Sequence, residues 1–274
     1  MEDWISYIIL AIVQGITEFL PVSSSGHLVL FNSFYDFDAG ILFDLALHVA
    51  TLFSVCAYYR KDIWGLLAGG FRELSSMASK GEDGKADERP NLWMILYIVV
   101  ATFITGVIGI LTDDYISSTF RTTLVVGINL IITSLILFAS RKVGALRMCD
   151  GRMNLKTALI IGLVQGFAVL PGISRSGSTI TAALLLGVES KDCAKFSFLL
   201  SIPVILGGFI LHVFKVESFD TSLLPVFIIS MIISAIIGYV CLVVLESLLK
   251  KAKFYRFSLY CFVVGIVAII LHFV

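Results

Sequence analysis

Residues 157–187 read TALIIGLVQGFAVLPGISRSGSTITAALLLG, and this stretch decides how the chain folds. Both ends of the stretch are apolar, whereas its centre, LPGISRSGS at 170–178, contains proline, glycine, serine and one arginine. One continuous α-helix does not accommodate such a centre, because proline and glycine interrupt helical hydrogen bonds and geometry. We therefore expect two short helices that meet at a non-helical tip.

The rest of the chain is more apolar than a soluble protein. Of its 274 residues, 58% are hydrophobic and only 15% are charged, whereas a soluble domain carries roughly a quarter charged residues. Six apolar runs are long enough to cross a hydrocarbon core of ~30 Å: 43–59, 92–112, 122–140, 196–214, 223–247 and 257–274. The sequence predicts an all-α integral membrane protein. The sequence has no basic stripe of the kind that binds nucleic acid, so we expect no nucleic-acid partner.

A second broken segment, at about 4–34, resembles the first. It contains LPVSSSGH at 20–27, and its VQG and SSSG elements recur as VQG and SRSG at an offset of 151 residues. Each broken segment is followed by three of the six apolar runs. The sequence therefore predicts two copies of one unit, at 1–140 and 157–274.

The positions of Lys and Arg predict how the two units are oriented. Four connecting segments hold 17 of the 20 Lys and Arg residues: 60–91, 141–156, 189–195 and 250–256. Cytoplasmic loops carry such an excess. All four lie on one side only if each broken segment enters and leaves the membrane on the same face. We expect six transmembrane helices plus two re-entrant helical hairpins, about 4–34 and 157–187, in an inverted-topology repeat, with a polar cytoplasmic loop at 60–91.

Paired broken helices in inverted halves are typical of a site near the membrane midplane. Arg175 is the one Lys or Arg inside the apolar region, and such a residue is by default functional. Its guanidinium suits phosphate oxygens, as do the backbone N–H groups of helix N-termini. Glu18 and His27 are candidates for base, metal ligand or general acid. His48 is interpreted as a histidine that packs between helices.

Two long motifs carry a resemblance to a known family. VQGITEFLPVSSSGH at 13–27 and LPGISRSGST at 170–179 resemble the two signature motifs of the undecaprenyl-diphosphatase family, (E/Q)xxxE with a Ser-Gly-His tail and PGxSRSxxT. The similarity covers the whole chain, including FSFLLSIPVILGG at 196–208. It implies removal of the terminal phosphate of undecaprenyl diphosphate, which regenerates the carrier for cell-wall polymers. It also implies a divalent cation, Mg²⁺ or Ca²⁺, and an association with bacitracin resistance.

The motifs give each side chain an expected role. We expect Arg175 to hold the diphosphate, Glu18 to bind the metal or activate the nucleophile, Ser24 to attack, and His27 to protonate the leaving phosphate. Gln14 fills the position at which some family members have Glu, so this helix offers one carboxylate. The expected substrate-binding residues are Gln14, Ser23, Ser25, Gly26, Ser174, Ser176 and Thr179.

Several alternatives stay open at this level. His27 could attack while Ser24 positions it, or a metal-activated water could be the nucleophile. A transporter or flippase for a phosphorylated polyprenyl lipid is the alternative function, because inverted repeats with broken helices occur in transporters. The resemblance places the chain in a bacterial plasma (inner) membrane with its substrate lipid, and we expect the site to open to the outer, periplasmic side. Oligomeric state is not fixed by the sequence, and a homodimer is one alternative.

Overall fold

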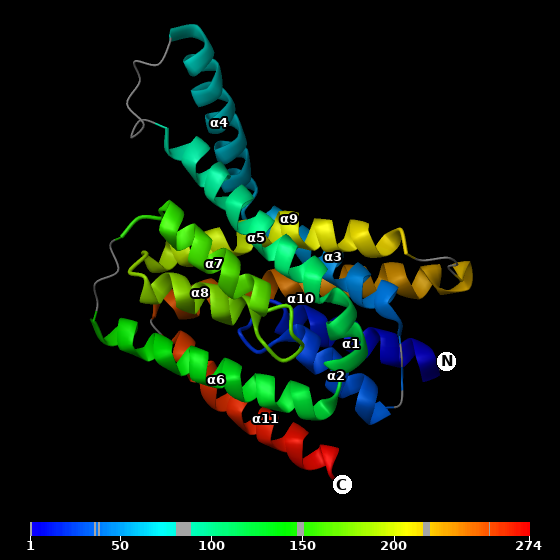
Figure 1. The fold of residues 1–274 in the computed structure, drawn as a ribbon. Coiled ribbons are helices and arrows are strands. Elements are labelled where there is room, and N and C mark those ends of the chain that lie inside the picture. Colours follow the sequence, from blue (N-terminus) through cyan, green and yellow to red (C-terminus); the bar gives the residue numbers. More distant parts are fainter. Residues whose placement is uncertain are drawn as a thin grey trace.

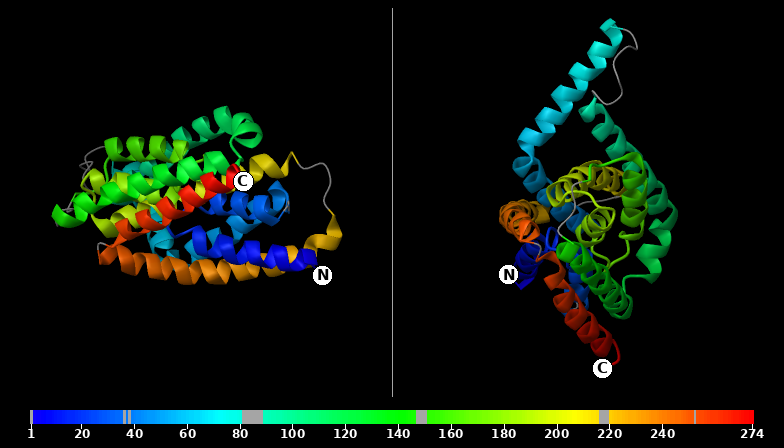
Figure 2. Two further views of the ribbon diagram at one scale, coloured as in Figure 1. Left: turned by 90° about the horizontal axis from the view of Figure 1, so that it is seen from below. Right: turned by 90° about the vertical axis from the view of Figure 1, so that its left-hand side faces the viewer.

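The chain folds into a bundle of helices. The computed structural model describes residues 2–35, 37, 39–80, 89–146, 151–215, 220–251 and 253–274. These residues form eleven α-helices and two short 3-10 helices, η2 (Thr221–Leu223) and η3 (Phe254–Arg256), with no β-strand among them. Most helices lie side by side, and α4 (Arg60–Lys80) projects away from the bundle (Figure 1 and Figure 2).

Within the described residues, six helices are long and apolar enough to cross a membrane. They are α3 (Ile41–Tyr58), α5 (Pro90–Thr119), α6 (Thr123–Leu146), α9 (Ser190–Val213), α10 (Leu224–Lys250) and α11 (Phe257–His272). Each coincides with one predicted apolar run, and even an 18-residue helix reaches about 27 Å at 1.5 Å per residue. The prediction of an all-α membrane protein with six long apolar helices is confirmed.

Four shorter helices form two pairs. The first pair is α1 (Glu2–Thr17) and α2 (Ser24–Tyr35), and the second is α7 (Leu155–Phe167) and α8 (Arg175–Leu185). The residues between the members of each pair are not helical, and we call them the first tip (18–23) and the second tip (168–174). No member of either pair reaches the roughly 20 residues that a transmembrane helix needs. The predicted breaks are therefore present, while the re-entrant position of the hairpins stays a prediction.

The predicted polar loop at 60–91 is wrong for its first part, because α4 covers residues 60–80. Ile63 and Leu66 of α4 pack against the main hydrophobic core. Farther along the helix, the Glu73 carboxylate accepts hydrogen bonds from the Asn91 side chain (2.6 Å) and from the Leu92 backbone N–H (2.9 Å). These contacts fix α4 against the start of α5, which charge composition alone did not indicate. Residues 81–88 lie outside the described residues.

The two hairpins each pack on a long helix from the other half of the chain. α1 packs along α10, and α7 packs along α5. Glycines permit both close approaches: a Cβ on Gly15 would lie 2.9 Å from the Ser234 carbonyl oxygen, and one on Gly162 would lie 2.9 Å from the Ala101 carbonyl oxygen. Each hairpin is therefore covered in part by the other half, and the halves are interwoven.

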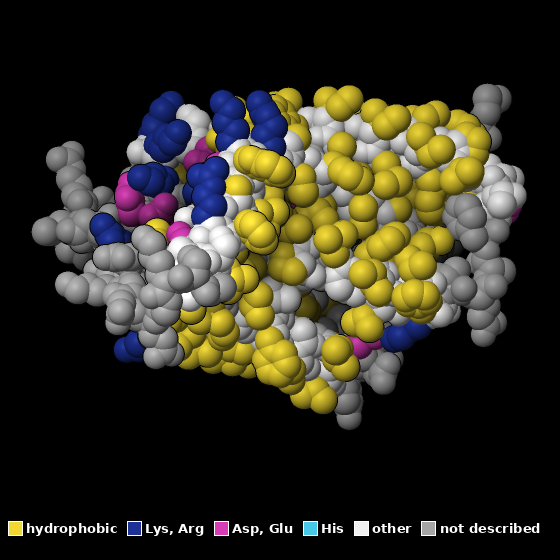
Figure 3. Space-filling view, turned by 90° about the horizontal axis from the view of Figure 1, so that it is seen from above, with side chains coloured by type: hydrophobic (Ala, Val, Ile, Leu, Met, Phe, Trp, Pro, Cys, Tyr) yellow, Lys and Arg dark blue, Asp and Glu magenta, His cyan; other side chains and the backbone are white. Residues whose placement is uncertain are grey.

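The surface is apolar and the interior contains polar side chains. Phe103, Leu135 and Leu259 are each at least 64% exposed, whereas Gln14 and Thr179 are fully buried. In Figure 3, hydrophobic side chains cover most of one face, Lys and Arg gather at one end, and a smaller charged group lies toward the other. A soluble protein rarely exposes so large an apolar surface. This arrangement suits a molecule surrounded by lipid.

Candidate active site

The two tips meet in the middle of the bundle (Figure 1). Ser23 Oγ accepts a hydrogen bond from the Gly172 backbone N–H at 3.1 Å. The backbones are so close here that a Cβ on Gly26 would lie 3.0 Å from the Gly172 Cα atom. Gly26, predicted to bind substrate, therefore has a packing role in this structure. Ser23 adopts a positive φ of 68°, which is uncommon for a residue with a side chain.

Helix α6 holds the second tip from the other side. Asn129 Nδ2 donates to the Pro171 carbonyl oxygen at 2.7 Å, and Thr133 Oγ1 donates to the Gly172 carbonyl oxygen at 2.8 Å. Thr133 Oγ1 also accepts from the Ser174 backbone N–H at 3.0 Å. Backbone groups that a helix would have satisfied are thus bonded by side chains, as irregular backbone inside a membrane requires.

Two helix N-termini face the place where the tips meet. Ser24 is the first residue of α2, and Arg175 is the first residue of α8. The preceding serines have the same role in both tips: Ser23 Oγ accepts from the Gly26 N–H at 3.3 Å, and Ser174 Oγ accepts from the Gly177 N–H at 3.1 Å. Helix N-termini carry partial positive charge and favour anions. Their convergence suits a phosphorylated ligand.

Glu18 is the centre of the polar cluster, and its side chain is 95% buried. Arg175 donates to Glu18 Oε1 in a buried salt bridge that joins the two tips. Ser24 Oγ donates to Glu18 Oε2 at 2.6 Å, and Gln14 Nε2 donates to the same oxygen at 2.9 Å. The structure therefore brings four sequence-predicted site residues into direct contact, although 157 positions separate Glu18 from Arg175.

His48 also belongs to this cluster, contrary to its interpretation as a packing residue. Its Nε2 atom lies 3.6 Å from Glu18 Oε2. Its Nδ1 atom lies 2.7 Å from the Asp44 carbonyl oxygen, which can only accept, so Nδ1 carries a proton and Nε2 is the nitrogen that faces the cluster. The available signal was its position as an ionisable residue inside an apolar run, which is by default functional.

His27 lies close to Ser24 in the sequence but bonds elsewhere. Its Nδ1 atom is 2.8 Å from the Ser23 carbonyl oxygen, and its Nε2 atom is 2.8 Å from the Tyr260 hydroxyl. The rings of His27 and Tyr260 are stacked, with an interplanar angle of 8°. A carbonyl acceptor fixes the proton on Nδ1, so Nε2 accepts from Tyr260. Both nitrogens are thereby used in joining the first tip to α11.

Three hydroxyls predicted to contact substrate are bonded to protein groups. Ser174 caps α8, Ser176 Oγ donates to the Phe19 carbonyl oxygen at 3.2 Å, and Thr179 Oγ1 donates to the Arg175 carbonyl oxygen at 2.8 Å. All three serine and threonine side chains are almost completely buried. In this structure they hold Arg175 and the start of α8 in place, and their contact with a phosphate stays a prediction.

A small pocket of about 190 Å³ leads outward from His48. Its polar lining comprises Ser25, Asp44, His48, Asp113, Arg121 and His212. Arg121 Nη2 lies 3.3 Å from Asp44 Oδ2, and Lys215 Nζ lies 2.8 Å from Asp113 Oδ2. We call this pocket the mouth. It lies at the opposite end of the long helices from the segments that hold most Lys and Arg. Ser25, which was predicted to bind substrate, lines the mouth beside the site.

Comparisons with known proteins identify the family of the chain. The family model described as "Bacitracin resistance protein BacA" matches residues 7–267, which include both tips. The chain belongs to this family. An undecaprenyl-diphosphatase of Methanosphaera stadtmanae is 40% identical over 276 residues, covering 99% of both chains. Undecaprenyl-diphosphatase 1 of Bacillus licheniformis is 42% identical over 97% of both chains, and the undecaprenyl-diphosphatase of Treponema denticola is 42% identical over 94% of both.

The family match confirms the resemblance that the two motifs indicated. It extends beyond those motifs to the six long helices, so the whole membrane domain is shared and not the tips alone. Within that shared chain, Glu18, Ser24 and Arg175 form the buried ionic cluster.

Proposed function

We propose that this member of the family is a membrane phosphatase that hydrolyses undecaprenyl diphosphate to undecaprenyl phosphate and inorganic phosphate. The single observation that carries the proposal is the contact of Glu18 with both Arg175 and Ser24 at the meeting point of the two tips. A cation for phosphate, a hydroxyl nucleophile and a carboxylate base are thereby assembled in one buried place. The reaction recycles the lipid carrier for cell-wall synthesis and accounts for the family's link to bacitracin.

Arg175 and the two helix N-termini bind the diphosphate. The guanidinium is planar and can offer two parallel hydrogen bonds to phosphate oxygens. The first-turn N–H groups of α2 and α8 add partial positive charge from both halves of the chain. Negative charge on the transferring phosphoryl group is therefore met by groups that the fold already holds in place, which favours the transition state.

Ser24 is the nucleophile that this arrangement supports best. Its Oγ atom attacks the terminal phosphorus while its proton passes to the Glu18 oxygen, 2.6 Å away. The bond from that phosphorus to the bridging oxygen breaks, and undecaprenyl phosphate leaves with the electron pair. Water then attacks the phosphoserine, giving up its proton to a base, and inorganic phosphate is released as Ser24 Oγ regains a proton. His48 Nε2, beside Glu18 and open to the mouth, is placed to carry these protons.

The expected role of His27 as the protonating group has less support, and so has its alternative role as the attacking group. Both His27 nitrogens are engaged, one by the Ser23 carbonyl oxygen and one by the Tyr260 hydroxyl. We therefore assign His27 to positioning the first tip, and His48 to the proton-transfer role that the sequence motif had given to His27.

A divalent cation fits the donors that the cluster provides. Mg²⁺ and Ca²⁺ bind oxygen ligands, and Gln14 Oε1 is a buried carbonyl oxygen without a hydrogen-bond partner among the described residues. Glu18 supplies the carboxylate beside it. The described residues contain no group of three His, Cys, Asp or Glu side chains suited to a metal, so substrate phosphate oxygens and water would complete the coordination. A bound cation would neutralise charge on the diphosphate.

The placement in the membrane follows from the distribution of charge. The end of the bundle rich in Lys and Arg faces the cytoplasm, so the mouth opens to the outer, periplasmic side of a bacterial plasma membrane. The hairpins α1–α2 and α7–α8 then enter the membrane from opposite faces as an inverted repeat. Their packing on α10 and α5 supports this, since enclosed non-helical backbone is tolerated at membrane depth.

Phosphate release tests the proposal. Detergent-purified protein with Mg²⁺ or Ca²⁺ is expected to release inorganic phosphate from undecaprenyl diphosphate, and Glu18→Gln is expected to lower kcat by about 100-fold or more, the loss of a principal acid–base group. Glu189→Gln is the matched control, because Glu189 is a half-exposed carboxylate whose ion pair among the described residues is with Lys191. Binding of the lipid without phosphate release by the wild-type protein would favour the transporter or flippase alternative.

A further inference from the structure

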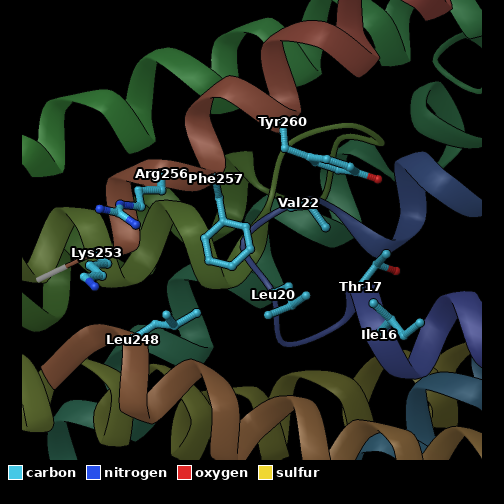
Figure 4. A pocket seen from close by; sticks show the side chains of 9 residues that line it. All are labelled: Ile16, Thr17, Leu20, Val22, Leu248, Lys253, Arg256, Phe257 and Tyr260. Carbon is cyan, nitrogen blue, oxygen red and sulfur yellow. The ribbon is translucent and has the colours of Figure 1, made fainter. Parts of the chain in front are cut away.

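A second pocket, of about 460 Å³, lies outside the catalytic cluster. It is formed by the end of α1, the first tip, the end of α10, η3 and the start of α11. Its size is within the usual range for ligand sites of roughly 300–1,000 Å³. Figure 4 shows two cations, Lys253 and Arg256, together at one end, and Ile16 and Thr17 at the other. Hydrophobic side chains, among them Leu20 and Phe257, lie between these ends.

The two cations have no acidic partner in the part of the chain that the structure describes. The lining of the pocket contains no Asp or Glu, and neither Lys253 nor Arg256 forms an ion pair with any acidic residue that the structure describes. The backbone beside them is anchored by two contacts: the Lys253 N–H donates to the Leu248 carbonyl oxygen at 3.1 Å, and Phe254 is buried in the main core. The protein therefore presents, beside an apolar space, two positive charges that have no acidic partner among the described residues.

The position of these charges along the bundle identifies the leaflet. Lys253 and Arg256 belong to 250–256, one of the four segments that place Lys and Arg at the cytoplasmic end. From there the pocket extends to Leu20 and Val22 of the first tip, which lies in the middle of the bundle (Figure 1). A pocket with a charged end at the membrane surface and an apolar end at mid-depth matches a lipid of the cytoplasmic leaflet.

We propose that this pocket binds one anionic phospholipid of the cytoplasmic leaflet. Its phosphate contacts Lys253 and Arg256, and an acyl chain lies along Leu20 and Phe257. Basic pockets between transmembrane helices on the cytoplasmic side bind anionic headgroups in this way. A zwitterionic lipid would leave net positive charge at the polar end, and a soluble anion would leave the apolar part uncovered.

The bound chain also lies next to the catalytic hairpin. Tyr260 lines the pocket, and its hydroxyl is 2.8 Å from His27 Nε2 on α2. Thr17, at the far end of the pocket, immediately precedes Glu18. A lipid in the pocket therefore packs against the first tip from the cytoplasmic leaflet, on the opposite side of the membrane from the mouth.

Lipid retention in detergent tests this site. Delipidated protein in dodecyl maltoside is titrated with palmitoyl-oleoyl phosphatidylglycerol or with the corresponding phosphatidylcholine, and bound lipid is counted by native mass spectrometry. We expect the wild-type protein to retain one phosphatidylglycerol in preference to phosphatidylcholine. Each membrane-surface cation contributes about fivefold to anionic lipid binding, so Lys253→Gln with Arg256→Gln should weaken retention roughly 25-fold.

The matched control removes equal charge from the same segment. Lys250→Gln with Lys251→Gln leaves the lining intact and should weaken retention much less than the Lys253 and Arg256 variant, because neither side chain lines the pocket. Leu248→Trp keeps both cations and fills part of the apolar space, so it should abolish the preferential retention of phosphatidylglycerol. Circular dichroism verifies that each variant is folded.

Four results would overturn the proposal. They are equal retention of the two lipids by the wild-type protein, undiminished retention by the Lys253 and Arg256 variant, an equal loss in the Lys250 and Lys251 control, and displacement of phosphatidylglycerol by equimolar polyprenyl monophosphate. The last result would assign the pocket to the reaction product.

Discussion

The two tips have the same backbone design and different chemistry. Ser23 and Ser174 occupy equivalent positions at an offset of 151 residues, and each caps the helix that follows it. At the next position the tips diverge, because the first has Ser24 and the second has Arg175. The second tip has only apolar residues, Ala168 and Val169, around the position that Glu18 occupies in the first.

This difference explains why the site needs both halves. The repeated serine caps and glycines build two converging helix N-termini, while the diverged positions supply a carboxylate and hydroxyl from one tip and a guanidinium from the other. A buried carboxylate without a cation would be costly, and so would a buried guanidinium without an anion. The salt bridge between Glu18 and Arg175 therefore stabilises the contact of the tips as well as preparing the chemistry.

The largest effect is expected from removing the hydroxyl that only the first tip has. Ser24→Ala should lower kcat by on the order of 1000-fold or more, because loss of a nucleophile removes the covalent route. Phosphate release from undecaprenyl diphosphate measures the change. Ser178→Ala is the control, since Ser178 Oγ is buried in the second tip's helix without a hydrogen-bond partner among the described residues. Comparable activity of the two variants would remove Ser24 from the covalent step.

The guanidinium of the second tip is tested by a change that keeps its charge. Arg175→Lys retains a cation beside Glu18 but loses the planar fork that matches phosphate. We expect kcat to fall roughly 100- to 1000-fold, the cost of losing one well-aimed donor to the transition state, with a smaller effect on KM. Full activity in the folded lysine variant would instead mean that Arg175 only balances the charge of Glu18.

Substitutions of the two histidines near the first tip are expected to have different effects, one mainly on activity and the other mainly on stability. Asn at position 48 can still donate to the Asp44 carbonyl oxygen but lacks Nε2, so His48→Asn should lower kcat about 100-fold, as for a lost proton carrier. His27→Asn loses the bond to Tyr260, and we expect a destabilisation of about 1 kcal/mol with a smaller loss of activity. Phosphate release and thermal unfolding of both variants measure the contrast. The reverse ranking would restore His27 to the catalytic role.

Much of the fold could be predicted because the membrane makes its signals strong. Run length located the six long helices, and proline with glycine located the two breaks. Helix ends with polar turns were less predictable: α9 begins at Ser190, six residues before the expected run, because its first turns carry polar residues while Cys193 and Ala194 are buried. α4 was missed for a different reason, because its contacts with α5 depend on tertiary packing.

The site was predictable where a residue's neighbours in the sequence revealed its environment. Glu18, Ser24 and Arg175 stand out as polar residues within broken apolar segments. His48 and Tyr260 act through contacts between segments far apart in the sequence, 233 positions in the case of His27 and Tyr260. Such contacts are set by how α3 and α11 pack around the hairpins, which motif spacing does not describe.

The contact between the tips can be tested with two glycines that share a backbone conformation. Gly172 has a φ of 93° and Gly187 has a φ of 85°, so alanine is strained at either position, by about 1–2 kcal/mol. A Cβ at position 187 would meet nothing within 4 Å, whereas one at position 172 would lie 2.6 Å from the Val126 carbonyl oxygen. We therefore expect Gly172→Ala to lower the free energy of unfolding by a further 1–3 kcal/mol or so, the usual cost of overpacking.

Gly172→Ala also has a functional consequence that Gly187→Ala lacks. Relieving the clash at position 172 requires the second tip to move away from α6, which breaks the bond from the Gly172 N–H to Ser23 Oγ and shifts Arg175 relative to Glu18. Gly172→Ala should therefore lose both stability and phosphate release, and Gly187→Ala should lose stability alone. Thermal unfolding in dodecyl maltoside and phosphate release separate the two. Equal activity in both variants would show that the site tolerates movement of the tips, and that their close contact serves folding rather than catalysis.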